Sequence, residues 1–344
     1  IELLKKSMHQ KYESFLQSEI FDSFGEVLIQ DATHFSLPRF LSNVFPGSYS
    51  RYGDCATAKI QATISLKKGI FRDLKLLSFR DSDQKDALRT IPLLHKNDLI
   101  IQDLGYFGIE VFKQINKRKA FFLSRYKFNT KVSDLKNKEL DLLKLLKKNK
   151  SCDLDVIIGG KNKIQCRLVA VKLPAEVAEE RIRRAKKDRS KKVNHSKRYY
   201  EQLHYTIFIT NVSKERWTPE NIIQAYKTRW YIEILFKGWK SNLKIKVDIP
   251  ERYMTKQRAE FYLYSCLLLV NLMVMPMFRL VQGTTKSNNQ HISILKLSAF
   301  INQHMHILIK RPTLKLVNMM KYYCAYEKRK DRINAIEIIC FTRH

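Results

Sequence analysis

Apolar residues recur along the chain in short runs typical of buried strands, and segments with helical spacing separate these runs. Two runs end on an acid: EVLIQD at 26–31 and DLIIQD at 98–103. Further strands are predicted at 58–66 and 69–78, which form a hairpin, and at 120–126, 155–158, 163–171 and 205–212. Helices are predicted at 86–96 and 109–119. This order predicts an α/β fold built on a mixed sheet.

Composition changes along the chain indicate five parts. The segment 1–23 is helical, 24–126 holds the first strands, 205–284 returns to regular structure, and 285–344 is polar, then helical and basic. Between them, 127–204 is rich in Lys and Leu and ends in a run dense in Arg and Lys at 181–198. We expect an insertion with a basic arm that contacts phosphates, because no long acidic stretch lies nearby. A solvated helix or linker is the alternative for this arm.

The most informative element is a helix predicted over 220–240. Four of its residues have offsets that place them within an arc of roughly 60° on one face: Tyr226, Arg229, Glu233 and Lys240. Trp230 and Lys237 lie next to that arc, and Trp230 could equally be a core residue. An apolar face lies beside the charged row, so the helix should pack on a core and present one carboxylate among cations and aromatics. The alternative is a surface helix with an Arg229–Glu233 ion pair worth about 0.2–0.5 kcal/mol.

Charge indicates the partner. The 344 residues are 44% hydrophobic, enough for a globular core, yet they carry 64 Lys and Arg against 33 Asp and Glu, a formal net charge of +31. So large an excess repels itself in the compact state, and a polyanion would offset it. Nucleic acid is the partner we expect, with a membrane surface as the competing one.

Other features exclude several classes of protein. The six cysteines are widely spaced without a C-x-x-C pair, which predicts reduced thiols in a cytosolic protein, and His304-x-His306 lacks further ligands at zinc-site spacing. The apolar run 261–278 is interrupted by polar residues and Pro276, which favours a buried core helix over a membrane span. Because the chain starts on Ile1, we expect it to be a fragment or a processed chain that lacks an upstream segment.

Three acids could form one site. Asp31 and Asp103 end predicted strands and Glu233 lies on the later helix, so all three could meet at one edge of the sheet. Converging carboxylates repel each other and persist mainly when divalent cations neutralise them. Two such ions suit in-line phosphoryl transfer. Each Asp could instead be an ordinary turn or cap residue at the end of its strand.

These motifs resemble those of DDE transposases. Asp31-Ala32-Thr33 and Asp103-Leu104-Gly105-Tyr106 follow apolar strands, and a basic insertion precedes Tyr226-x-x-Arg229-x-x-x-Glu233-x6-Lys240. In this order they are similar to the YREK signature of the insertion sequence 4 family of bacterial cut-and-paste transposases, over about residues 24 to 283. Arg167-Leu-Val-Ala-Val-Lys-Leu-Pro and Ile207-Phe-Ile-Thr-Asn also resemble that family's insertion region and its return strand.

The resemblance implies an RNase H-like core, a mixed sheet flanked by helices, with a β-rich insertion domain before the last catalytic helix. Asp31, Asp103 and Glu233 would hold two Mg²⁺ or Mn²⁺ ions, and Tyr226, Arg229 and Lys240 would contact phosphates. Nicking, hairpin formation and strand transfer would act on double-stranded DNA, at the inverted-repeat ends and at the target. A homodimer pairing two ends and a cytoplasmic, nucleoid-associated bacterial location are also implied. From the same helix face we add Trp230 and Lys237 to the DNA contacts.

The chain departs from the family pattern at two positions. Ala32 follows the first acid where Gly or Ser is frequent, and Tyr205 stands where a Trp often precedes the return strand and stacks on a flipped base. A Tyr ring can also stack, with less area. Two other functions remain open: a different two-metal nuclease or resolvase of the same fold, and a non-catalytic DNA-binding transposase remnant.

Overall fold

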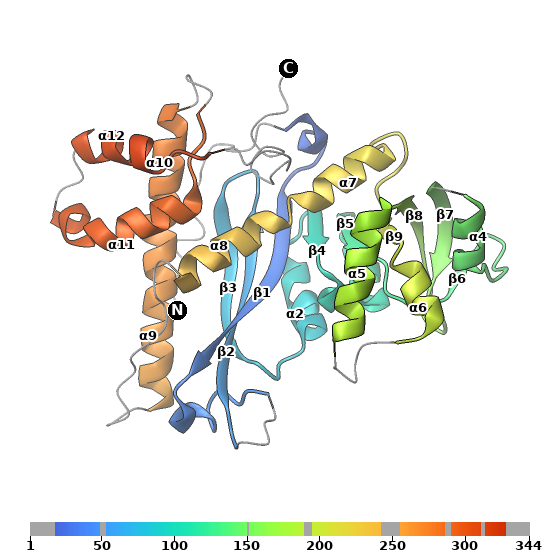
Figure 1. Cartoon of the computed structure of the whole chain (residues 1–344), viewed down its shortest axis with the longest axis horizontal. Helices are drawn as coiled ribbons and strands as arrows, with labels where there is room; N and C mark the ends of the chain where they lie inside the picture. Colours follow the sequence, from blue (N-terminus) through green and yellow to red (C-terminus); the bar gives the residue numbers. More distant parts are fainter. Residues whose placement is uncertain are drawn as a thin grey trace. The chain divides into compact units, whose positions relative to one another are not determined.

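The computed structural model describes residues 18–48, 53–149, 151–188, 195–241, 255–285, 290–310 and 314–327 (Figure 1). The chain divides into two compact units, and each is described by itself. Unit 1 comprises residues 1–19, 26–86 and 227–344; unit 2 comprises 20–25 and 87–226. The expected domain boundaries at 23/24, 126/127, 204/205 and 284/285 come from changes in composition along the chain, and they stay predictions.

Among its described residues, unit 1 contains three antiparallel strands in the order β3-β2-β1: β1 Val27–Leu37, β2 Ala56–Ser65 and β3 Ile70–Ser78. The predicted hairpin between β2 and β3 is present, and its turn ends at Gly69 with φ +60°, a backbone angle that glycine adopts without strain. Leu28 pairs with Ser65 and Leu37 with Ala56 at the two ends of the β1–β2 ladder.

The prediction that the first strand ends on Asp31 is wrong. β1 continues six residues further to Leu37, and Asp31 pairs with Ala62 in the middle of the strand. The reason is that residues 32–37 keep the strand alternation: Thr33 and Leu37 are buried, whereas His34 is exposed. At Asp31 the strand changes from residues that are all buried, 27–30, to residues 31–36, of which all but Thr33 are at least partly exposed.

The β1–β2 strands have a polar layer on the face opposite Asp31. Lys59 is 3% exposed and its Nζ donates to the carbonyl of Asp81 and to Asp83 Oδ1 at 3.0 Å. Gln61 donates to the same carboxylate, and Gln30 donates to Asp86 Oδ2 at 3.0 Å. These acids lie in the first turn of α2 (Asp83–Thr90), so buried hydrogen bonds attach that turn to the sheet. The helix predicted at 86–96 thus begins earlier and passes into a 3₁₀ turn at Pro92, whose ring cannot continue an α-helix.

Helices complete unit 1 (Figure 1): η2 Arg39–Leu41, α8 Trp230–Ser241, α9 Lys256–Leu269, the π-helix η5 Val270–Val274, α10 Met275–Thr285, α11 Ile294–Lys310 and α12 Leu314–Tyr323. α8 runs along β1, and Trp239 packs on Phe71 of β3 with ring centroids 5.1 Å apart. α9 buries Ala259 and Leu263 in a cluster with Leu37 and neighbouring apolar residues of β2.

The segment Lys256–Thr285 is long and apolar enough to cross a membrane, and 39% of its apolar window is buried inside the protein. Ala259, Leu263 and Leu267 face the interior, as a core helix requires, whereas Phe261 is 75% exposed. Pro276 is accommodated by the π turn that precedes it, where the missing N–H is tolerated.

Unit 2 contains six strands in the order β4-β5-β9-β8-β7-β6: β4 Leu99–Gln102, β5 Phe121–Arg125, β6 Val132–Ser133, β7 Ser151–Ile158, β8 Ile164–Lys172 and β9 Tyr205–Thr210. β4 and β5 are parallel, and every other pair is antiparallel. The flanking helices are η1 Glu19–Phe21, η3 Ile91–Leu93, η4 Leu104–Tyr106, α3 Ile109–Lys117, α4 Leu142–Lys148, α5 Ala175–Lys187, α6 Lys197–Gln202 and α7 Pro219–Lys227. The predicted α/β class, a mixed sheet flanked by helices, is confirmed.

Strands of the insertion, β6 to β8, extend the sheet of unit 2 through β9. Arg167 of β8 fixes this junction: it is 3% exposed, forms two hydrogen bonds to Asp153 at 2.7 and 2.8 Å, and donates to the carbonyl of Trp217 at 2.7 Å. Trp217 in turn donates from Nε1 to the carbonyl of Ile20 at 2.7 Å. One buried guanidinium therefore connects the insertion to the loop after β9.

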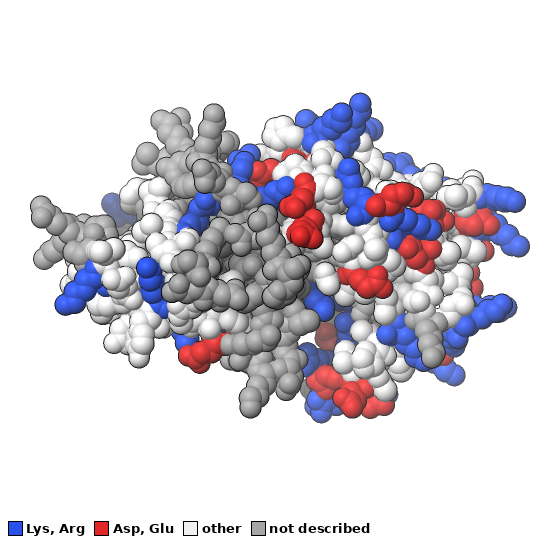
Figure 2. Space-filling view, turned by 90° about the horizontal axis from the view of Figure 1, so that it is seen from above, with Lys and Arg blue, Asp and Glu red and all other residues white. Residues whose placement is uncertain are grey.

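The basic arm begins on α5. Its Arg183 and Arg184 form ion pairs with Glu180 of the same helix, so part of its positive charge is already neutralised. On the face drawn in Figure 2, basic and acidic side chains are interspersed. Of the expected arm, residues 189–194 lie outside the described part of the chain.

Candidate active site

In unit 1, one arginine joins two of the three predicted acids. Arg229 Nη1 lies 2.9 Å from Asp31 Oδ2, and Arg229 Nη2 lies 2.6 Å from Glu233 Oε1. The exposed fractions of the three side chains are 10% for Arg229, 15% for Asp31 and 33% for Glu233. Asp31 and Glu233, far apart in the sequence, therefore lie within reach of a single cation. The ion pair between Arg229 and Glu233 is present, but it is part of a larger, largely buried group.

Strand geometry explains why Asp31 reaches this position. Neighbouring residues of a strand point to opposite faces. Gln30 points to the polar layer under α2, so Asp31 points to the face along which α8 runs. The backbone N–H of Ala32 donates to Asp31 Oδ1 at 2.8 Å and helps to fix the carboxylate. Ala32 is as compatible with this arrangement as Gly or Ser, since only its backbone is used.

The single helix predicted over 220–240 is wrong: it is two helices. α7 ends at Lys227 and α8 begins at Trp230, with a turn at Thr228 and Arg229. At this turn the N–H of Tyr231 bonds to the carbonyl of Thr228 at 2.9 Å, an i→i+3 bond that tightens the backbone. The helical phase is therefore not continuous, and the four signature residues do not form one uninterrupted stripe.

In unit 2, the third predicted acid, Asp103, is hydrogen-bonded to Tyr226, another residue of the predicted signature. Asp103 directly follows β4, as predicted, in an extended conformation before η4. Tyr226 at the end of α7 donates from its hydroxyl to Asp103 Oδ1 at 3.1 Å, and its ring packs against Phe208 of β9 with centroids 5.0 Å apart. Tyr226 thus holds a carboxylate in this structure, whereas the sequence predicted a phosphate contact.

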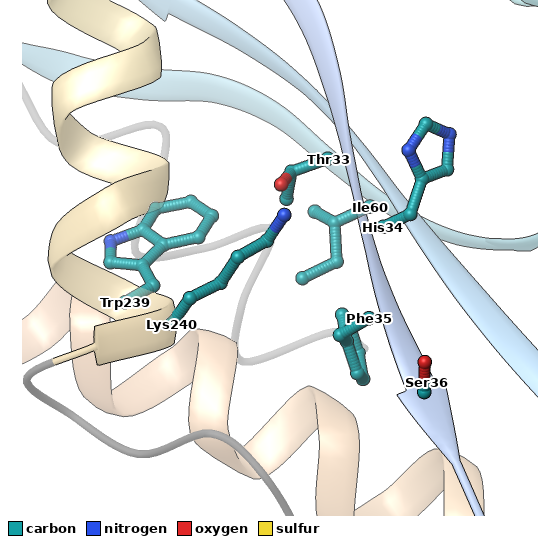
Figure 3. Close-up of a pocket in the computed structure, with 7 residues that line it drawn as sticks. All are labelled: Thr33, His34, Phe35, Ser36, Ile60, Trp239 and Lys240. Carbon is teal, nitrogen blue, oxygen red and sulfur yellow. The ribbon is translucent and has the colours of Figure 1, made fainter.

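A cavity of about 230 Å³ lies against β1 and α8 in unit 1 (Figure 3). It is lined by Thr33, His34, Phe35 and Ser36 of β1, Ile60 of β2, and Trp239 and Lys240 of α8. Lys240 extends toward Thr33, and partial burial lowers its pKa. Sequence analysis missed the four β1 residues, although the alternation of 32–37 indicated that the strand continued past the acid.

The remaining predicted contacts fall into two groups. Trp230 is 57% exposed and lies 5.8 Å from the Arg229 guanidinium, and Lys237 is exposed, so both are available to a partner. Tyr205 is different: it is 8% exposed and its hydroxyl donates to the carbonyl of Leu146 at 3.0 Å. The expectation of a stacking surface at Tyr205 is not met, because its ring fills the interior beside α4.

The donor chemistry fits a divalent metal, since Asp31 and Glu233 offer hard carboxylate oxygens to one shared position. Within the ranges that the structure describes, no three His, Cys, Asp or Glu side chains gather closely enough to hold an ion. Arg229 instead supplies the positive charge between the two acids of unit 1. Burial raises the pKa of Cys166 to about 12, far from that of a reactive thiol.

Comparison with known proteins identifies the family. The family described as "Transposase DDE domain" matches residues 22–272, most of the chain. The chain belongs to this family. Among relatives, the transposase for insertion sequence element IS231F from Bacillus thuringiensis subsp. israelensis is 29% identical over 323 residues, 86% of this chain and 66% of that protein. The transposase for IS1151 from Clostridium perfringens is 30% identical over 256 residues, 67% of this chain and 54% of that protein.

This member of the DDE family spans about two thirds of the length of its first relatives: 66% of the IS231F transposase and 65% of the IS231E transposase. A similar solved structure is the piggyBac transposase synaptic complex with hairpin DNA. It has a TM-score of 0.43 and 11% identity, and the match covers 89% of this chain and 59% of that one.

Proposed function

We propose that this chain is the catalytic part of a cut-and-paste DNA transposase that uses two-metal phosphoryl transfer. The observation that carries this proposal is the meeting of Asp31 and Glu233 at one cation, in a chain of the DDE family. Asp103, with Tyr226 bound to it, would be the third acid of the site. When bound, two Mg²⁺ or Mn²⁺ ions supply activation of the attacking oxygen and stabilisation of the leaving oxygen.

The proposed reaction consists of successive displacements at phosphorus. In the first, the oxygen of water bonds to phosphorus, the bond to the 3′ oxygen breaks, and that oxygen leaves protonated as a 3′-hydroxyl. In the next, the oxygen of this 3′-hydroxyl bonds to phosphorus of the opposite strand and loses its proton, which closes a hairpin, while the 3′ oxygen of the flanking DNA leaves as a hydroxyl. Water then bonds to the phosphorus of the hairpin and releases the 3′-hydroxyl of the transposon end. This hydroxyl finally bonds to phosphorus of the target DNA, and a 3′ oxygen of the target leaves as a hydroxyl. Asp31, Asp103 and Glu233 would hold the ions, and the hydroxyl of Tyr226 would orient Asp103.

The DNA contacts of this proposal come from α8. Lys240 meets a phosphate as a point charge, and Lys237 adds a second charge on the exposed side of the helix. Trp230 offers an exposed ring on which a base can stack. The partners are inverted-repeat ends and target DNA, brought together by a homodimer, in the bacterial cytoplasm at the nucleoid.

The test is an assay of strand cleavage and strand transfer on labelled duplexes that carry the element's own ends, with Mg²⁺ or Mn²⁺. It is run with this chain and with a form extended to the length of its relatives. Joined products support the transposase. Cleavage without joining supports a nuclease or resolvase of the same fold, and binding without cleavage in both forms supports a non-catalytic remnant.

Lys240→Gln is expected to weaken binding to end-containing DNA and to reduce the salt dependence of log K by about one phosphate contact, because one point charge is lost. The measurement is a fluorescence-anisotropy titration at several salt concentrations. Lys296→Gln is the matched control, since Lys296 of the same unit is already paired with Glu327 at 2.7 Å. Equal salt slopes for wild type and Lys240→Gln would remove Lys240 from the interface.

A further inference from the structure

Arg229 lies between two of the predicted catalytic acids, Asp31 and Glu233, in unit 1. Its two terminal nitrogens each contact a different carboxylate, at 2.9 and 2.6 Å, and its side chain is 10% exposed. A guanidinium with this fork neutralises two acids at once, as a bound divalent ion would. The acids and the arginine all belong to unit 1, so this group is complete within one compact part of the chain.

The positive charge of Arg229 affects how a second cation can bind to Asp31 and Glu233. Without a cation between them, the carboxylates of Asp31 and Glu233 would repel each other. With Arg229 in place, a second cation that approaches the same carboxylates meets the repulsion of a fixed positive charge. The two oxygens of Asp31 have different partners. Oδ1 accepts a hydrogen bond from the N–H of Ala32, and Oδ2 accepts one from Arg229. Arg229 and a metal ion therefore compete for the same negative charge.

We propose that Arg229 is an internal counter-ion of the catalytic acids, which holds Asp31 and Glu233 together before metal binds and weakens metal binding until it moves away. This proposal rests on the proposed function, since the competing ion is the metal of that site. Once displaced, Arg229 becomes available to a phosphate of the DNA, for which its planar fork is suited. Metal and DNA then assist each other: the phosphate stabilises the arginine in the position that frees the acids.

The test is a titration of the full chain with Mn²⁺ in the absence of DNA, with free Mn²⁺ followed by electron paramagnetic resonance. Arg229→Gln is expected to bind Mn²⁺ at least about fivefold more tightly than the wild type, the lower end of the usual range for coupled binding events. Its Tm without metal is expected to fall and to recover when Mn²⁺ is added. Arg229→Lys keeps the positive charge but not the two-nitrogen fork, so its Mn²⁺ affinity should lie between those of the wild type and Arg229→Gln. Arg229→Lys replaces Arg229→Gln in the titration if Arg229→Gln does not fold.

Lys75→Gln is the matched control, because Lys75 of the same unit also contacts two carboxylates, Asp73 at 2.7 Å and Asp86 at 3.4 Å. Asp86 is 2% exposed and already accepts a hydrogen bond from Gln30 at 3.0 Å, so burial disfavours an added ion between Asp73 and Asp86, and the control should keep wild-type Mn²⁺ affinity. The double variant Asp31→Asn with Arg229→Gln should lose the gain, which assigns the ion to Asp31. The counter-ion proposal is overturned if the wild type and Arg229→Gln bind Mn²⁺ equally well, or if Lys75→Gln gains as much Mn²⁺ affinity as Arg229→Gln. Either result leaves the proposed function standing. Absence of Mn²⁺ binding in every form overturns the metal site and the proposal with it.

Discussion

Replacing Asp103 by asparagine is expected to lower the rate of Mg²⁺-dependent DNA cleavage by roughly 10³-fold or more, because the proposed mechanism uses the Asp103 carboxylate as a charged metal ligand. Asparagine keeps the Oδ1 acceptor for the Tyr226 hydroxyl, which lies 3.1 Å away in the wild type. The fold should therefore persist, and DNA binding should be unchanged or tighter. The measurements are single-turnover cleavage of a labelled transposon end and an anisotropy titration with the same DNA.

Tyr226→Phe is the matched control for this prediction. It removes the hydrogen bond to Asp103 but keeps the aromatic ring that packs against Phe208. A hydrogen bond to a charged group is worth roughly one power of ten in rate, so we expect a loss of about tenfold. If Asp103→Asn loses no more activity than Tyr226→Phe, Asp103 positions the site without holding metal. If Asp103→Asn cleaves at the wild-type rate, it is no part of the site.

The sequence predicted those parts of the fold whose signals are local. The β2–β3 hairpin, β4 followed by Asp103, and α3 were all predicted, because short apolar runs and turn residues carry enough information over ten residues. The three acids were selected from the order and spacing of motifs. Within unit 1, Asp31 and Glu233 each contact Arg229, and the catalytic role of the three acids stays a prediction.

Tertiary interactions determined what the sequence could not predict. The alternation of residues 32–37 is compatible with a longer strand, but it is the pairing with β2 that extends β1 beyond Asp31. The break at Thr228 and Arg229 is equally invisible in a periodicity that continues through it. Arg229 was expected at a phosphate because the sequence could not show that a strand nearly 200 residues earlier supplies a carboxylate on the same side.

The insertion illustrates the same limit. Strands β7 and β8 were predicted, whereas the two-residue β6 was not, and their membership of the sheet of unit 2 depends on the pairing of β8 with β9 and on Arg167. A buried arginine within an alternating strand gives no sequence signal of its partners. Tyr205 likewise was a stacking candidate only while its burial against α4 was unknown.

Asp153→Asn is expected to destabilise the protein by about 3 kcal/mol, because it leaves the Arg167 guanidinium buried without its counter-charge. Arg167 is 3% exposed, and the carbonyls of Ser213 and Trp217 that it also contacts are neutral. Because Arg167 joins the insertion to the loop after β9, the backbone amides of that loop should be the first to lose protection from hydrogen exchange. The measurements are urea unfolding and amide hydrogen exchange across residues 205–217.

Asp155→Asn on the same strand separates this effect from a general loss of negative charge. Asp155 is 50% exposed and lies 3.5 Å from Lys214, which is 46% exposed, so the pair is screened by water and contributes less than about 1 kcal/mol. The two variants change the same net charge two residues apart. If they unfold at the same urea concentration, the Arg167–Asp153 pair contributes no more than a surface ion pair, and the attachment of the insertion must come from the strand ladder between β8 and β9 instead.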